Sequence, residues 1–94
     1  MDSKIKIQRV DNEELYHKTK RALMDIILQN PDDNTPFKLP NEAELSQSLW
    51  ASRHVLRDAL MGLEEIGVVT RRPSIGAIAN PKIARANSLL DINP

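Results

Sequence analysis

Cysteine is absent from this 94-residue sequence, and its aromatic residues are reduced to one tryptophan, one tyrosine and one phenylalanine. Without cysteine the chain has no disulfide framework and no cysteine-based zinc site, which fits a reducing compartment. No apolar run approaches the length of a membrane span, and the N-terminus lacks the hydrophobic stretch of a secretion signal. We therefore expect one small cytoplasmic domain with no role at a membrane.

An excess of one charge is also missing. Lys plus Arg and Asp plus Glu both number 13, so the formal net charge is zero, which argues against a chain that only coats nucleic acid. The two histidines, His17 and His54, are isolated in the sequence, and there is no glycine-rich phosphate loop and no paired carboxylate motif. We expect no enzyme activity, no catalytic residue, no metal site and no cofactor.

The strongest pattern predicts an amphipathic helix over about residues 52–66. Ser52 is suited to be its N-cap, and Gly67 is suited to the left-handed position that follows a helix. The apolar residues recur at three- and four-residue spacing, which builds one face for a core. They are Val55, Leu56, Ala59, Leu60, Leu63 and Ile66.

The polar face of this helix opens with Arg53, His54 and Arg57. Positive charge at a helix N-terminus is mildly unfavourable for the helix itself, because the macrodipole already places partial positive charge there. Such a turn makes sense if it meets an anion, and nucleic acid is the obvious one.

A shorter helix is predicted just upstream, with Asn41 as N-cap, Glu44 closing a capping box and Pro40 preventing extension backwards. Two helices that meet across residues 50–52 form a helix-turn-helix, whose second helix enters the major groove of DNA. Residues 68–79 follow with β-branched residues on both sides of a turn, so they predict a hairpin, or wing.

Upstream of these elements, residues 1–10 are expected to form a flexible arm, and a helix is expected from Asp11 to Asn30. Its apolar pattern runs through Leu15, Thr19, Ala22, Leu23, Ile26 and Ile27. Its polar side is suited either to phosphate contacts or to a plain solvated face. This side holds His17, Lys18, Lys20 and Arg21.

Several blocks of the sequence, in order, resemble the N-terminal winged helix-turn-helix domain of GntR-type bacterial transcription regulators. The blocks are Leu39–Leu45, Ser52–Leu60, Leu63–Val69, Arg71-Arg72 and Gly76. The resemblance implies a mainly α fold with a small β-hairpin (α+β) over residues 11–80. It also implies sequence-specific binding of double-stranded DNA, with the helix at 52–66 in the major groove and the wing near the minor groove.

Matching arginines in the family contact DNA, so the resemblance assigns DNA contacts to the start of the second helix and to the wing. The predicted DNA-binding residues are Ser52, Arg53, His54, Arg57, Arg72, Ser74 and Gly76. Arg is suited to this role because its rigid fork matches guanine or a phosphate. Base reading is assigned to Arg53, and for Arg71 a place facing the sheet remains open.

Two single residues and one short stretch depart from the family pattern. Ala43 stands where many members have a DNA-contacting arginine, and Trp50 replaces the usual glycine of the turn. For Trp50 we expect another turn geometry with the ring packed on the core, rather than stacking on a base. Pro73–Ile75 replaces the usual glycine at the wing tip, which leaves Gly76 to let the backbone approach DNA.

Residues 81–94 end in Leu89-Leu90-Asp91, which is similar to the linker of the FadR-like branch of the family. This resemblance implies an absent C-terminal effector-binding domain for a small carboxylate, a homodimeric full-length regulator and a palindromic operator. For the chain itself we expect a monomer. The alternative is a winged-helix protein-interaction module without DNA specificity.

Overall fold

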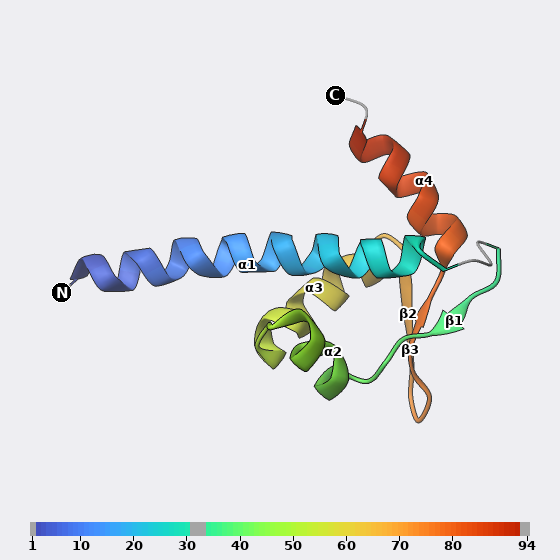
Figure 1. Cartoon of the computed structure of the whole chain (residues 1–94), viewed down its shortest axis with the longest axis horizontal. Helices are drawn as coiled ribbons and strands as arrows, with labels where there is room; N and C mark the ends of the chain where they lie inside the picture. The colour runs from blue at the N-terminus through green and yellow to red at the C-terminus, as the bar shows by residue number, and fades with distance from the viewer. Residues whose placement is uncertain (1, 31–33, 93–94) are drawn as a thin grey trace.

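The computed structural model describes residues 2–30 and 34–92, and the side chains of residues 13–30 and 34–88. Within these ranges the elements follow one another as a long helix, a short strand, two helices, a hairpin and a last helix (Figure 1). They are α1 (Asp2–Leu28), β1 (Phe37–Lys38), α2 (Glu42–Leu49), α3 (Arg53–Glu65), β2 (Val69–Arg72), β3 (Gly76–Ala79) and α4 (Pro81–Ile92). This is the α+β winged helix-turn-helix that the sequence predicts.

The helix boundaries of the helix-turn-helix follow local rules of capping. The Asn41 side chain accepts from the Glu44 amide at 2.8 Å, and the Glu44 carboxylate accepts from the Asn41 amide at 3.2 Å, so the predicted capping box is confirmed. Ser52 caps α3 by accepting from the Val55 amide at 3.2 Å. Gly67 follows α3 with φ 81°, the left-handed backbone that glycine adopts without steric cost.

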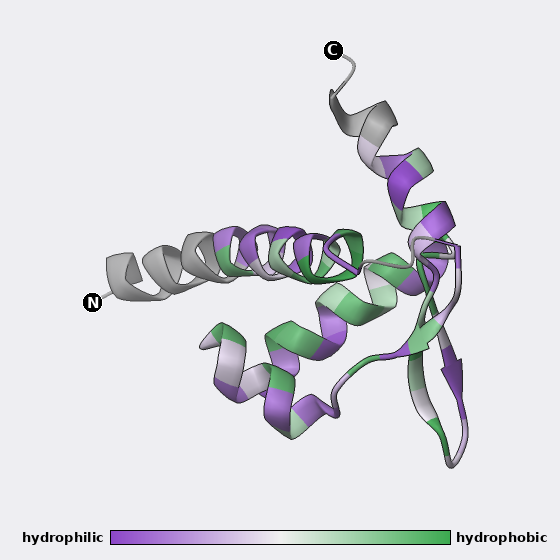
Figure 2. Ribbon diagram, turned by 45° about the vertical axis from the view of Figure 1, so that its right-hand side comes forward, coloured by the Kyte–Doolittle hydropathy of each residue, from purple (hydrophilic) through white to green (hydrophobic). Residues whose placement is uncertain are grey.

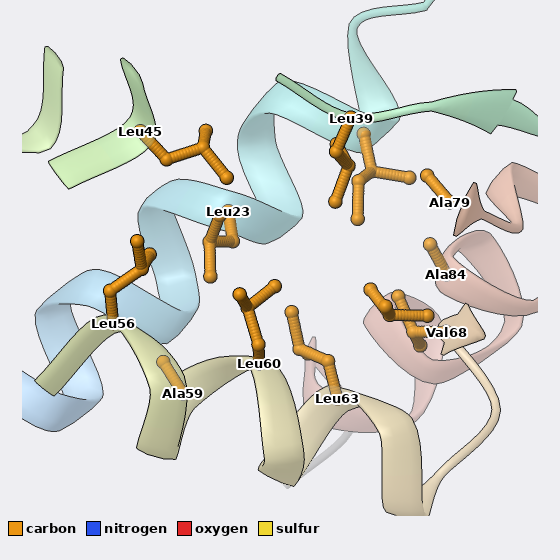
Figure 3. Close-up of a cluster of buried hydrophobic side chains, with 12 residues drawn as sticks. Leu23, Leu39, Leu45, Leu56, Ala59, Leu60, Leu63, Val68, Ala79 and Ala84 are labelled. Carbon is orange, nitrogen blue, oxygen red and sulfur yellow. The ribbon is translucent and has the colours of Figure 1, made fainter. Parts of the chain in front are cut away.

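The core lies where α1 crosses α3, with α2, the sheet and α4 closing its edges (Figure 3). Leu23 of α1 and Leu45 of α2 meet Leu56, Leu60 and Leu63 on the inner face of α3. All five side chains are at most 2% exposed. Burial of one such side chain stabilises the fold by about 1.5–3 kcal/mol, so this cluster fixes how α3 is held.

Two positions of the predicted core are wrong. Leu15 is 42% exposed, although it shares a face of α1 with the buried Thr19, because the rest of the domain does not cover this turn. Ile66 is 43% exposed, because it is the C-cap of α3 and its backbone (φ −101°, ψ 9°) has left the helical geometry. Periodicity shows which face of a helix is apolar, but not how far along the helix that face is covered.

The predicted start of the first helix at Asp11 is also wrong, since the backbone of α1 is helical from Asp2 onwards. Residues 2–10 of the predicted arm thus belong to α1, and Met1 lies outside the described residues. Asp11 has the chemistry of an N-cap, but Asp and Glu residues inside a helix give the same sequence signal as a capping box.

The wing hairpin belongs to a three-stranded antiparallel sheet in the order β1-β3-β2. Ala79 of β3 pairs with Val69 on one side and with Phe37 on the other. The hairpin was predicted, but β1 was not, because a strand of two residues is too short to show a period. The pairing with β1 ties the loop before α2 to the wing (Figure 1).

Residues 81–94, predicted as a linker, contain α4. Pro81 opens this helix at a position where a missing amide costs nothing, and the Ala84 amide donates to the Asn80 carbonyl at 3.0 Å. Ala84 is fully buried and belongs to the core cluster, so the start of α4 packs on the rest of the fold. The side chains of residues 89–91, which suggested the FadR-like branch, lie outside those described. None of the helices in the described residues is long and apolar enough to span a membrane.

Candidate nucleic-acid interface

The first turn of α3 presents polar side chains to solvent. Ser52, Arg53 and His54 are all exposed, while the next two residues, Val55 and Leu56, enter the core. Within the described part of the chain, Arg53 has no hydrogen bond or ion pair. Its guanidinium is therefore available to a ligand, beside the unpaired amides that every helix N-terminus presents.

His54 lies one residue further along, and its side chain contacts the next turn of the same helix. Its Nε2 is 3.5 Å from Oδ2 of Asp58, and the two side chains are 86% and 51% exposed. An exposed pair at this spacing contributes little to stability, so the imidazole can move to meet a ligand. This histidine belongs to no group of metal-ligating side chains among the described residues.

Arg57 is held by an acidic residue of the neighbouring helix. Its Nε donates to Oε1 of Glu42 at 2.9 Å, with the two side chains 57% and 33% exposed. Because only Nε is used, the two terminal nitrogens of the guanidinium keep their donors free for another acceptor. The pair thus orients the Arg57 side chain, and it also places one negative charge beside it.

The two arginines of β2 differ in their surroundings. Nη2 of Arg71 is 4.0 Å from Glu42, and its Nε is 3.9 Å from Glu64, so Arg71 lies between acidic residues of α2 and α3. Arg72 is exposed at the end of β2, in the strongly hydrophilic part of the wing (Figure 2). Only Arg72 of this pair presents its charge at the wing tip.

The wing tip is a tight turn in which the Ile75 amide donates to the Arg72 carbonyl at 3.1 Å. Pro73 and Ser74 are its central residues, and Ser74 has φ 71°. Glycine is usually required at this position of such a turn. Gly76 follows with φ 116°, so Ser74 and Gly76 both adopt positive φ at the wing tip.

A further cation near the wing was missed. Lys38 of β1 pairs with Ile78 of β3, is exposed, and its Cε would be 3.4 Å from a side-chain carbon added at Gly76. Strand pairing therefore brings Lys38 beside the tip that holds Arg72. The only signal in the sequence is a lysine between two apolar residues, Phe37 and Leu39, which fits an edge strand but also many loops.

Three basic residues in the second half of α1 lie near the other end of α3. His17, Lys20 and Arg21 line a shallow hollow together with Leu63 and Ile66, near the C-terminal end of that helix. Ten residues separate Arg53 from Leu63, which is about 15 Å along a helix axis. This placement favours the solvated face over phosphate contacts beside the first turn of α3.

The prediction for Trp50 is wrong in both parts. The residue adopts the left-handed conformation (φ 55°, ψ 36°) that a glycine would take at this turn, and its side chain is 93% exposed. The core side of the turn is occupied by Ala51, which is only 7% exposed, so the indole points outward. Ala43, the other departure in this region, is exposed in the first turn of α2.

Comparison with known proteins agrees with the winged helix-turn-helix fold. Residues 15–78 match the gntR family of bacterial regulatory proteins. Over 46 residues the chain is 52% identical to a protein of Bacillus subtilis (strain 168) named as an uncharacterized HTH-type transcriptional regulator, YcbG. That match covers 49% of this chain and 20% of the relative, so it spans about a fifth of the relative's length. No solved structure matches the chain.

Proposed function

Since this chain belongs to the gntR family of bacterial regulatory proteins, we propose that it binds double-stranded DNA in a sequence-specific way. In this proposal the N-terminal end of α3 enters the major groove and the wing lies along the adjacent minor groove. The observation that supports it most is the first turn of α3, where Arg53 is exposed and has no partner among the described residues, on a helix whose opposite face is buried in the core.

Each side chain of this surface has a distinct role in the proposal. Arg53 reads base edges, because it is nearest the end of the helix that points into the groove, and His54 adjusts the preference. Ser52, through its hydroxyl proton, and Arg57, through its free terminal nitrogens, grip phosphates. Arg72 does the same at the wing, where Ser74 and Gly76 let the backbone come close.

Sequence specificity is tested by selecting duplexes from a randomised pool with the 94-residue chain. Binding of the selected duplex and of a scrambled version is then followed by fluorescence anisotropy at one salt concentration. We expect tighter binding to the selected duplex, because base contacts add to the phosphate contacts that both duplexes share. Equal affinity for the two duplexes would overturn sequence specificity, and no binding to either would favour a protein-interaction module.

The oligomeric part of the proposal concerns the whole regulator. We propose that the chain is monomeric alone and pairs on a palindromic operator, with the stable homodimer contacts in another part of the longer protein. Analytical ultracentrifugation without DNA should then give the mass of one chain, and a full palindrome should give twice the stoichiometry of a half-site. A tight dimer without DNA would contradict this. A FadR-like branch and a small carboxylate effector stay predictions about that longer protein.

A further inference from the structure

Trp50 is the single tryptophan of the sequence and the most exposed large hydrophobic side chain among those described. It stands in the turn between α2 and α3, two residues before the cap of α3. Its ring is 93% exposed, so the indole buries almost no area within this chain. A residue of this size that contributes nothing to the core raises the question of what it contacts.

The turn holds Trp50 in a fixed position. The Ser46 carbonyl accepts from the amide of Trp50 and from that of Ala51, the latter at 3.1 Å. The Ser46 hydroxyl in turn donates to the carbonyl of Ala51. Because Ala51 is packed on the core, these hydrogen bonds fix the backbone around Trp50. The direction in which the indole leaves the surface is therefore also fixed.

The backbone at Trp50 is in an unfavourable state for such a residue. A left-handed conformation with φ 55° is costly for a bulky side chain, whereas glycine adopts it freely. No burial within the described chain offsets this cost. Strain that the fold does not need is a feature of functional positions, so we look for the compensation in a partner.

We propose that Trp50 contacts the sugar-phosphate backbone of the bound duplex, with its indole N–H donating to a phosphate oxygen and its ring lying against deoxyribose. This inference rests on the proposed function. Trp50 precedes Arg53 by three residues, so it lies at the rim of a groove that the start of α3 enters. Duplex bases are stacked and offer no free face, while the phosphates at the rim offer acceptors to an indole, which is a donor only.

Because the chain has one tryptophan, its fluorescence reports on this position alone. A phosphate and sugar contact carries no sequence information, so a duplex of mixed sequence at low salt is a sufficient probe. We expect the emission to be quenched and shifted when the duplex is added, in step with the anisotropy of a labelled duplex. Binding seen by anisotropy with unchanged tryptophan emission would overturn the contact. Absence of binding by anisotropy would instead overturn the proposed function.

Two variants separate a contact with DNA from a role in the fold. Trp50→Gly should raise the melting temperature by a few degrees, because the left-handed strain is relieved and no packing is lost. The same variant should bind the duplex about fivefold more weakly, since a hydrogen bond to a charged phosphate is lost. Trp50→Phe should keep the melting temperature of the parent and bind with an intermediate affinity, because it keeps a ring and lacks the N–H.

The results that overturn the inference are equally defined. A lower melting temperature for Trp50→Gly would show that the ring supports the fold, and an unchanged affinity would show that it does not touch DNA. An emission shift that depends on protein concentration without DNA would assign the ring to a contact between two copies of the chain.

Discussion

The two faces of α3 differ in what restrains them. On the inner face, Leu56, Ala59, Leu60 and Leu63 are at most 2% exposed and pack against α1, α2 and the sheet. On the outer face, the exposed side chains of the first two turns are restrained by the Ser52 cap and by two ion pairs among the described residues, His54 with Asp58 and Arg57 with Glu42. Packing is fixed before any ligand arrives, whereas the polar turn keeps donors free, so stability and binding should respond to different substitutions.

The largest expected effect is on the inner face. Leu60→Ala should lower the free energy of unfolding by about 2–5 kcal/mol, because it removes buried methyl groups and leaves a cavity. Urea denaturation measures this loss. Met61→Ala is the matched control, since the neighbouring Met61 is 53% exposed and its truncation should change stability by less than about 0.5 kcal/mol. Equal losses in the two variants would contradict the division of α3 into two faces.

On the outer face, Arg53→Ala should cost about 1–3 kcal/mol of binding to the selected duplex and much less on the scrambled one. Its stability should match that of the parent, because the side chain is exposed and unpaired within the described residues. Lys18→Ala, which removes an exposed cation of α1, is the control. It should weaken binding to the two duplexes equally or leave both affinities unchanged. Anisotropy titrations with the selected and the scrambled duplex measure these affinities. An equal loss of affinity for both duplexes in Arg53→Ala would show that Arg53 contacts phosphate and does not read bases.

The ion pair between Arg57 of α3 and Glu42 of α2 gives the smallest effect and one of opposite sign. Glu42→Gln removes a negative charge beside Arg57 and Arg71, so binding to the scrambled duplex should strengthen about twofold. One charge at about 8 Å from a phosphate contributes about 0.5 kcal/mol in water. Glu65→Gln, exposed at the far end of α3, should have a smaller effect in the same titration. Weaker binding by Glu42→Gln would mean that it orients Arg57 more than it repels DNA.

The features that the sequence predicted correctly are those that depend on residues close together in the chain. The capping box of Asn41, the cap at Ser52 and the left-handed Gly67 depend on neighbours within a few residues, and all three are confirmed. The missed features depend on residues distant in the sequence. Glu42 reaches Arg57 across fifteen positions, and Lys38 reaches the wing only through a strand pairing.

At Trp50, by contrast, general residue preferences gave the wrong prediction. A propensity rule argued against a left-handed tryptophan, and the usual preference of aromatic rings for the core argued for burial. Each rule states only which conformation or environment is lower in free energy. Trp50 adopts the less favourable one in both respects, since it is left-handed and its side chain is exposed. The resemblance to the family does show that tryptophan is unusual at this position, and residues that break a local rule are found mainly at functional sites.

The salt dependence of duplex binding tests the central claim most directly, namely that the exposed turn of α3 and the wing bind DNA. The logarithm of the affinity should fall linearly with the logarithm of the salt concentration, with a slope of about −0.9 for each phosphate neutralised. Removing Arg57 and Arg72 together should make that slope shallower by about two. A flat dependence for the parent chain, or the same slope in the double variant, would contradict the claim.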